Sequence, residues 1–322
     1  MKTNVLGRTG YEIGALGLGC YQFTGEFGVT PDKSWEIMDY AMRSEINFID
    51  TAQMYGWGEG EEIVGRGLYA YPSKKTVVST KVGFLHDRTV SRSRGMAAYT
   101  DIVEIKRAIK HSLWLLRRDF VEIFMIHEPE HTDWWGINCD TGDSVILSVL
   151  EELKKEGVIG YIGIGGWDMH INAMLVNTGR IDVALCAGGI NLLAKPIFDE
   201  LIPAAKKHNA GVVAGGCFGQ NNPFLINKDK EYVRQLSKNC GKSNQGEMAY
   251  YQKLLALYDL ADELNVSMTE LAIGYILSFD DIHVHIPGAR EVTHLIENLN
   301  AADKGALSED IVGRINEIEN KL

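Results

Sequence analysis

Four polar side chains stand at or just beyond the ends of three apolar segments, and together they could move a proton. Asp50 ends the first segment, and Tyr55 follows shortly after it. Lys81 ends the second segment and His127 ends the third. A lysine ammonium favours the tyrosinate and so lowers a tyrosine pKa, while an aspartate keeps the lysine charged. With a neutral histidine to orient a carbonyl oxygen, the set predicts the proton donor that hydride transfer to C=O requires.

Each of these residues also has a structural interpretation when taken alone. Asp50 could cap the following turn, Lys81 could form a structural ion pair, and His127 could be a core histidine. Their joint occurrence at three successive segment ends favours a catalytic site. The set lacks the several histidine and carboxylate ligands of a metal centre, so no metal is expected.

The segments that would position these side chains alternate between strand-like and helix-like patterns. Candidate strands cover residues 15–19, 47–51, 76–82, 121–127, 159–164, 181–187, 211–216 and 283–287. Candidate helices cover 32–44, 60–69, 101–116, 143–156, 169–177, 196–208 and 269–277, with Asp143 as the cap of the fourth. Residues 221–251 are expected to form a long loop, followed by extra helices at 247–264 and 308–322.

This alternation indicates an α/β fold with parallel strands and crossover helices. An open doubly wound sheet usually carries a Gly-x-Gly-x-x-Gly turn, but Gly17-Leu18-Gly19 lacks the third glycine. Eight units in about 300 residues suit a (β/α)8 TIM barrel. No Pro/Ser-rich linker divides the chain, so residues 1–322 are predicted to form a single domain.

Composition excludes several classes of function. The net charge of −11 disfavours a nucleic-acid partner, which needs a basic face. No apolar run reaches the length of a membrane span, and no signal-like segment opens the chain. The five dispersed cysteines form no Cys-x-x-Cys, so free thiols in a reducing cytoplasm are expected. The sequence leaves the oligomeric state open.

Several motifs make the chain resemble the aldo-keto reductase superfamily from about residue 4 to residue 302. They are Leu6-Gly7-Arg8-Thr9-Gly10, Asp50-Thr51-Ala52-x-x-Tyr55-Gly56, Ser79-Thr80-Lys81, Ile126-His127-x-Pro129 and Ile286-Pro287-Gly288-Ala289-Arg290. The resemblance implies a barrel with an N-terminal hairpin that binds NAD(P)H without a Rossmann fold. It implies Tyr55 as general acid/base, Lys81 and Asp50 as its tuning pair, and His127 as the group that orients the substrate.

The resemblance also implies cofactor contacts near both ends of the chain. They are Gly19, Cys20, Tyr21 and Asp50 near the first strands, and Pro287, Gly288, Ala289, Arg290, His294, Glu297 and Asn298 near the last. Arg290 could pair with a 2′-phosphate, which favours NADP. His294 stands where many members have a further basic residue, so NAD remains the alternative.

The nicotinamide end departs from the common family pattern. Gly165-Gly166 replace a Ser-Asn pair, Ala187 replaces a glutamine, and Gly215 replaces a stacking tyrosine, with Gly216, Cys217 and Phe218 completing the segment. The combination resembles the D-threo-aldose and L-fucose dehydrogenases, which oxidise a free sugar at its anomeric carbon. The glycines could leave room for the ring and expose backbone groups, or they could simply form tight turns.

The predicted function is therefore NAD(P)-dependent hydride transfer to or from a carbonyl or hydroxyl carbon, most simply of a sugar or related polyol. Substrate contacts are expected from Tyr55, His127, Trp134 and Trp135, because indole rings stack on pyranose faces. The tryptophans could equally bury against the barrel rim. The alternative is an NADP-binding, redox-sensing regulatory subunit with little turnover; the complete set of four polar residues favours the enzyme.

Overall fold

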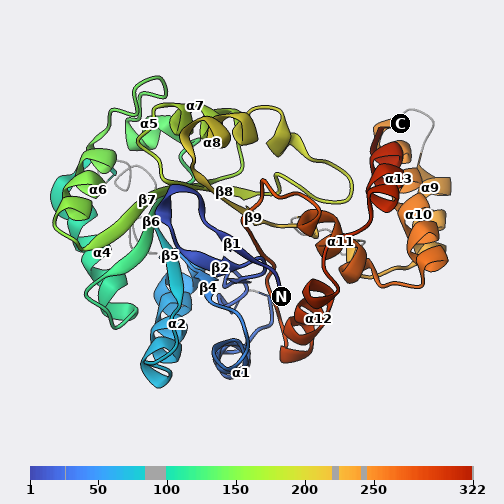
Figure 1. The fold of residues 1–322 in the computed structure, drawn as a ribbon, viewed down its shortest axis with the longest axis horizontal. Helices are drawn as coiled ribbons and strands as arrows, with labels where there is room; N and C mark the ends of the chain where they lie inside the picture. The colour runs from blue at the N-terminus through green and yellow to red at the C-terminus, as the bar shows by residue number, and fades with distance from the viewer. Residues whose placement is uncertain (26, 84–98, 220–224, 241–244, 321–322) are drawn as a thin grey trace.

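Eight parallel strands form the centre of the computed structural model, which describes residues 1–25, 27–83, 99–219, 225–240 and 245–320 (Figure 1). They pair in chain order: β3 (Leu18–Gly19), β4 (Phe48–Asp50), β5 (Val77–Val82), β6 (Val121–His127), β7 (Ile159–Gly166), β8 (Val183–Ala187), β9 (Gly211–Gly215) and β10 (Val284–Ile286). Backbone N–H groups of Gly17 and Gly19 donate to the carbonyls of His285 and Pro287 at 2.8 and 3.2 Å. These bonds join β3 to β10, so the predicted (β/α)8 barrel is confirmed.

Helices surround the barrel at the positions that the alternating pattern predicts, except for α12 (Val292–Lys304), which that pattern did not identify. They are α1 (Pro31–Arg43), α2 (Glu59–Ala70), α4 (Ile102–Leu115), α6 (Val145–Lys155), α7 (Met169–Asn177), α8 (Leu201–His208), α11 (Met268–Leu277) and α12 (Val292–Lys304). The expected cap of α6 is wrong by one residue, because the Ser144 side chain, not Asp143, accepts a hydrogen bond from Leu147 N. Asp143 instead pairs with Arg180 at 2.9 Å.

An N-terminal hairpin closes the end of the barrel opposite the carboxyl ends of the strands. Strands β1 (Thr3–Val5) and β2 (Glu12–Gly14) pair antiparallel. Leu6 and Ile13 are fully buried in a cluster with inward-facing strand residues such as Phe48 and Ile123. The hairpin thus fills the barrel floor with apolar side chains and leaves the other mouth for polar groups.

Several helices lie outside the predicted pattern. The segment 196–208 divides into a 3₁₀ turn (Pro196–Phe198) and α8, and the stretch expected to be a loop contains α9 (Lys230–Asn239). Helix α9 gathers with α10 (Gln245–Leu264) and α13 (Glu309–Asn320) on one side of the barrel (Figure 1). The last two residues of the helix predicted at 308–322 lie outside the described residues. None of the helices within the described ranges is long and apolar enough to cross a membrane.

Candidate active site

A buried ion pair anchors the mouth of the barrel. Lys81 Nζ donates to Asp50 Oδ2 at 2.6 Å and to the Thr51 carbonyl at 2.8 Å, and both charged side chains are almost fully buried. Asp50 Oδ1 accepts a further bond from Ser79 Oγ at 2.7 Å. Burial disfavours both charges, but Asp50 holds the pKa of Lys81 above its usual value, so the lysine remains an ammonium.

Tyr55 lies directly against this ion pair. It begins the short 3₁₀ turn η2 (Tyr55–Gly58) that follows β4, and its hydroxyl oxygen accepts a hydrogen bond from Lys81 Nζ at 3.3 Å. Burial raises the pKa of Tyr55 to about 12, although the Lys81 charge opposes this rise. Lys81 acts on the pKa of Tyr55 in the direction that the sequence predicts, but desolvation of the phenol outweighs the lysine, so the net shift is upward. Tyr55 is a protonated hydroxyl near neutral pH.

His127 ends β6 on the other side of Tyr55. The two rings meet edge to face, with centroids 5.9 Å apart. Burial, assisted by Lys81, lowers the pKa of His127 well below its usual value. The structure therefore brings Asp50, Tyr55, Lys81 and His127 together, with the histidine neutral as the sequence predicts.

The glycine pair at the end of β7 adjoins these four residues. Strand β7 extends past the predicted Ile164 to Gly166, and Gly165 pairs in register with His127. A Cβ on Gly165 would lie 3.1 Å from both Cδ and Cε of Lys81. At Gly166, a Cβ would overlap the carboxyl of Glu130. Close approach of other side chains therefore accounts for both glycines, beyond the turn-forming role considered from the sequence.

The ends of β8 and β9 lie beside Gly165 and Gly166 and carry only small residues. Ala187 and Gly215 lie opposite each other, and a Cβ on Gly215 would have no neighbour closer than 3.7 Å. Gly216 has a φ of 73°, so its backbone conformation requires glycine. Cys217 is buried, with a thiol pKa raised well above its usual value by burial, and Phe218 is half-buried beside it.

The seam between β3 and β10 holds the other predicted cofactor residues. Gly19 bridges Gly288, while Cys20 is fully buried and Tyr21 is exposed with its ring 5.2 Å from that of Tyr55. Pro287 and Ala289 follow β10 as buried residues. A side chain that the sequence did not single out, Gln22, fills the space over Gly288.

Helix α12 and the turn before it present the remaining residues of this group. Arg290 is exposed, with its guanidinium 5.3 Å from the Phe27 ring centroid. His294 and Glu297 are exposed on α12, whereas Asn298 is almost fully buried. Within the described residues, no partner reaches the buried Asn298 Nδ2 or Gln22 Oε1. Both atoms therefore lack the hydrogen-bond partners that buried polar groups normally have.

The two tandem tryptophans have different environments. Trp135 is fully buried, donates its indole N–H to the His127 carbonyl at 3.1 Å and packs edge-on against Tyr99. The structure contradicts a substrate-stacking role for Trp135, because no face of its ring is open. Trp134 is only half-buried and stacks on His131 with centroids 3.9 Å apart. They belong to the short helix α5 (Thr132–Trp135), within a segment expected to be a loop.

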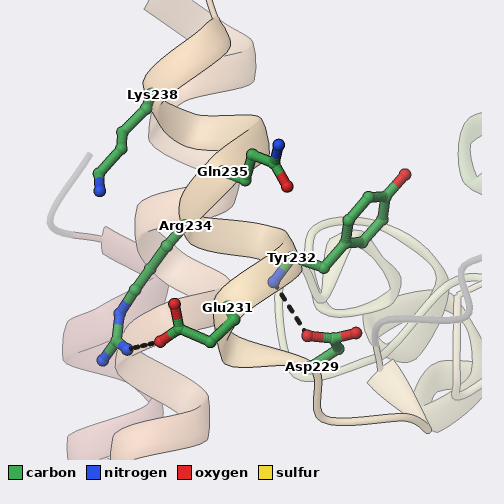
Figure 2. A pocket seen from close by; sticks show the side chains of 6 residues that line it. All are labelled: Asp229, Glu231, Tyr232, Arg234, Gln235 and Lys238. Atoms are coloured by element: carbon green, nitrogen blue, oxygen red, sulfur yellow. Dashed lines mark hydrogen bonds and ion pairs between the residues drawn. The ribbon is translucent and has the colours of Figure 1, made fainter.

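Within the described residues, neither a metal cluster nor the hollow on α9 offers a better candidate for the active site. Nowhere in the described ranges do three or more histidine, cysteine or carboxylate side chains gather as a metal site would require. A surface hollow on α9 is bordered by side chains of that helix and its cap alone (Figure 2). There Arg234 pairs with Glu231, and Asp229 caps the helix at Tyr232 N. Two of its charges thus pair with each other, and a third accepts a hydrogen bond from the backbone.

The chain belongs to the Aldo/keto reductase family, whose model matches residues 15–320. The fold and the family together define an NAD(P)-dependent oxidoreductase of the aldo-keto reductase type. The resemblance expected from the motifs is thereby confirmed.

Individual relatives agree with this assignment. The chain is 28% identical over 314 residues to "Uncharacterized oxidoreductase YqkF" of Bacillus subtilis (strain 168), covering 96% of this chain and 94% of that protein. It is 25% identical over 311 residues to the D-threo-aldose 1-dehydrogenase of a Pseudomonas species, covering 91% and 90%. The aldo-keto reductase AKR11C1 from Bacillus halodurans, in its holo form, matches the fold with a TM-score of 0.72 at 21% identity, covering 99% and 96%.

Proposed function

We propose that this enzyme transfers hydride between NADP, or NAD as the alternative, and a carbonyl or hydroxyl carbon of a sugar or related polyol. The observation that carries this proposal is the hydrogen bond from the buried Lys81 ammonium to the Tyr55 hydroxyl, beside a neutral His127. Because Lys81 donates into the phenol oxygen, the phenol proton is left to point at a substrate oxygen.

The residues present fit a nicotinamide cofactor. Gly215 at the end of β9 has no side chain, and the buried Gln22 Oε1 and Asn298 Nδ2 atoms along the β3–β10 seam have no hydrogen-bond partner among the described residues. Arg290 is exposed next to this seam, where a guanidinium could pair with a 2′-phosphate. When bound, the cofactor supplies or accepts the hydride.

In the reducing direction, Tyr55 donates its proton to the carbonyl oxygen while His127 orients that oxygen by hydrogen bonding. Lys81 stabilises the tyrosinate that results, and Asp50 keeps the lysine charged. In the oxidising direction, Tyr55 accepts the hydroxyl proton. The phenol pKa near 12 means that Tyr55 begins the reduction fully protonated.

A sugar or polyol is the proposed substrate class on two grounds. One relative bears the name D-threo-aldose 1-dehydrogenase. Aromatic side chains are also present near the site: Trp134 is half-buried in the loop beyond His127, and Trp57 and Trp167 are 42% and 55% exposed just beyond Tyr55 and Gly166. The acids Glu128 and Glu130 in that loop disfavour a strongly anionic substrate.

The regulatory alternative remains weaker, because such a subunit would not need a proton donor paired to a buried lysine. A single barrel domain and a cytoplasmic location also remain part of the proposal. The test is a panel of free sugars, polyols and small aldehydes with both cofactors, followed at the nicotinamide absorbance band. Turnover of sugars or polyols supports the proposal. Tight cofactor binding without turnover across the panel would instead support the regulatory subunit.

A further inference from the structure

The carboxyl of the half-buried Glu130 lies over the end of β7, with its Oε2 atom buried, one residue beyond the glycine that adjoins Lys81. Glu130 reaches this position from the loop after β6, and its Oε1 accepts a hydrogen bond from the Trp167 backbone N–H at 3.2 Å. Its other oxygen occupies the space that a Cβ on Gly166 would fill. The loop that follows His127 has therefore placed a polar group where β7 carries no side chain.

Asn172, from the first turns of α7, completes this cluster. Its side chain is fully buried, and its Oδ1 lies 3.0 Å from the Cβ position of Gly166. Glu130 Oε2 and both polar atoms of Asn172 are buried without a hydrogen-bond partner among the described residues. Buried polar atoms of this kind are costly unless something satisfies them. A carboxyl oxygen and a side-chain amide, each with unused hydrogen-bonding groups, therefore lie close together.

The position of this cluster relative to Tyr55 limits what can bind there. Gly165, the neighbour of Gly166, pairs with His127 and touches the Lys81 side chain. The hydride-carrying ring must lie in contact with the carbonyl carbon whose oxygen Tyr55 and His127 hold. A ring that exchanges hydride with this carbon would therefore lie near the end of β7.

We propose that Glu130 receives the carboxamide of the nicotinamide and, as a carboxylate flanked by Asn172, favours the oxidised cationic ring over the neutral reduced ring. This inference rests on the proposed function, and it deepens it by assigning a bias toward oxidation of the substrate. The carboxamide NH₂ supplies the donor that Glu130 Oε2 lacks, and the Asn172 amide can accept or donate beside it.

The charges around Glu130 make the effect depend on pH. Burial raises the pKa of Glu130 to about 7, and the nearby carboxylates Glu128 and Asp168 add to the rise. Lys81 is the cation on the other side of Gly165, and His131 pairs with Glu128 at 3.3 Å. The carboxamide N–H opposes the rise with either form of the cofactor, and the cationic ring opposes it further, so binding of oxidised cofactor releases more protons near pH 7 than binding of reduced cofactor.

Titrations of the whole protein with oxidised and reduced NADP, each read by protein fluorescence and calorimetry, test this inference. Glu130→Gln keeps the size and hydrogen-bonding ability but removes the charge. It should weaken oxidised cofactor about tenfold and reduced cofactor less than about threefold, equivalent to roughly one pKa unit of interaction. The matched control is Asp133→Asn, an exposed carboxylate on the adjoining helix α5, which should change neither affinity.

The wild-type protein provides a second readout that needs no variant. Calorimetry in buffers of different ionisation enthalpy should show more proton release at pH 7 with oxidised NADP than with reduced NADP. Equal proton release with both forms, or equal weakening of both by Glu130→Gln, overturns the inference and leaves the proposed function intact. Failure of the wild-type protein to bind NADP or NAD in either form would overturn the proposed function itself.

Discussion

Gly165 and Lys81 share one space at the barrel mouth: the Cδ and Cε atoms of the lysine lie 3.1 Å from the point that a Cβ on the glycine would occupy. Strand β7 therefore leaves the path open along which Lys81 reaches Asp50 and Tyr55. This contact explains a glycine that the sequence alone assigns to the cofactor or to a turn.

Gly165→Ala tests this explanation. The added methyl should displace the Lys81 side chain, weaken its hydrogen bonds to Asp50 and Tyr55, and lower kcat about tenfold or more, since a small misplacement of a catalytic group is costly. Steady-state kinetics with the best sugar of the panel and fluorescence titration of NADPH provide the measurements. Gly313→Ala is the matched control, because a Cβ on this exposed glycine of α13 would have no neighbour within 4 Å. A fully active Gly165→Ala enzyme would show that Lys81 does not depend on this opening.

Tyr55→Phe should abolish the proton transfer while leaving the fold and cofactor binding unchanged. Loss of a positioned general acid costs about 10²- to 10⁴-fold in rate. We expect kcat to fall by that amount, with an NADPH affinity close to that of the wild type. Measurement of both quantities on the same preparation separates catalysis from binding. Turnover near the wild-type rate would contradict the role of Tyr55.

Arg290→Ala should distinguish the two cofactors. A guanidinium that pairs with a 2′-phosphate contributes to NADPH binding and not to NADH binding. We expect the Kd of NADPH to rise about tenfold and that of NADH to change less than about twofold, as measured by fluorescence quenching. A similar change for the two cofactors would assign Arg290 to the surface and to its contact with Phe27.

Glu61, which lies behind the active site, should make the stability of the protein depend on pH. It is fully buried on α2 and accepts a hydrogen bond from Thr80 at 2.6 Å, and burial raises its pKa to about 7. The folded state therefore retains a proton that the unfolded state releases above about pH 4.5. The protonated Glu61 therefore adds to the free energy of unfolding below pH 4.5. This stabilisation declines as the pH rises toward 7 and is absent above pH 7.

Glu61→Gln should remove that dependence. Relative to the variant, the wild type should lose roughly 3 kcal/mol of unfolding free energy between pH 4.5 and 7, since each pKa unit is worth about 1.36 kcal/mol. Urea unfolding at several pH values measures the difference. Glu62→Gln, the exposed neighbour, should parallel the wild type. Parallel curves for Glu61→Gln and the wild type would show that Glu61 does not carry a raised pKa.

The strands and the four polar residues at their ends could be predicted from the sequence, because both are indicated by residues that are neighbours along the chain. Strand β6 and helix α7 have the predicted bounds, since β-branched runs and a capping Asp168 are local signals. Helix α12 was missed, although Val292, Leu295 and Leu299 repeat at helical spacing. That pattern could have identified it.

The burial of individual side chains and the contacts between distant segments could not be predicted from the sequence. The pKa of Tyr55 depends on how deeply the phenol is enclosed, which no local pattern reveals. The placement of Glu130 over Gly166 depends on how a loop folds back on the next strand. The burial of Trp135, beside the half-buried Trp134, likewise follows from packing against Tyr99.

The hydrogen bonds between the first and last barrel strands also have a consequence for synthesis of the chain. Gly19 and Gly288 meet at the closing seam, so the mouth of the barrel exists only once both have been made and joined. A nascent chain that has left the ribosome as far as His127 already contains Asp50, Tyr55 and Lys81, yet it lacks β7 to β10. We therefore expect the cofactor site to be among the last features to form as the protein is translated.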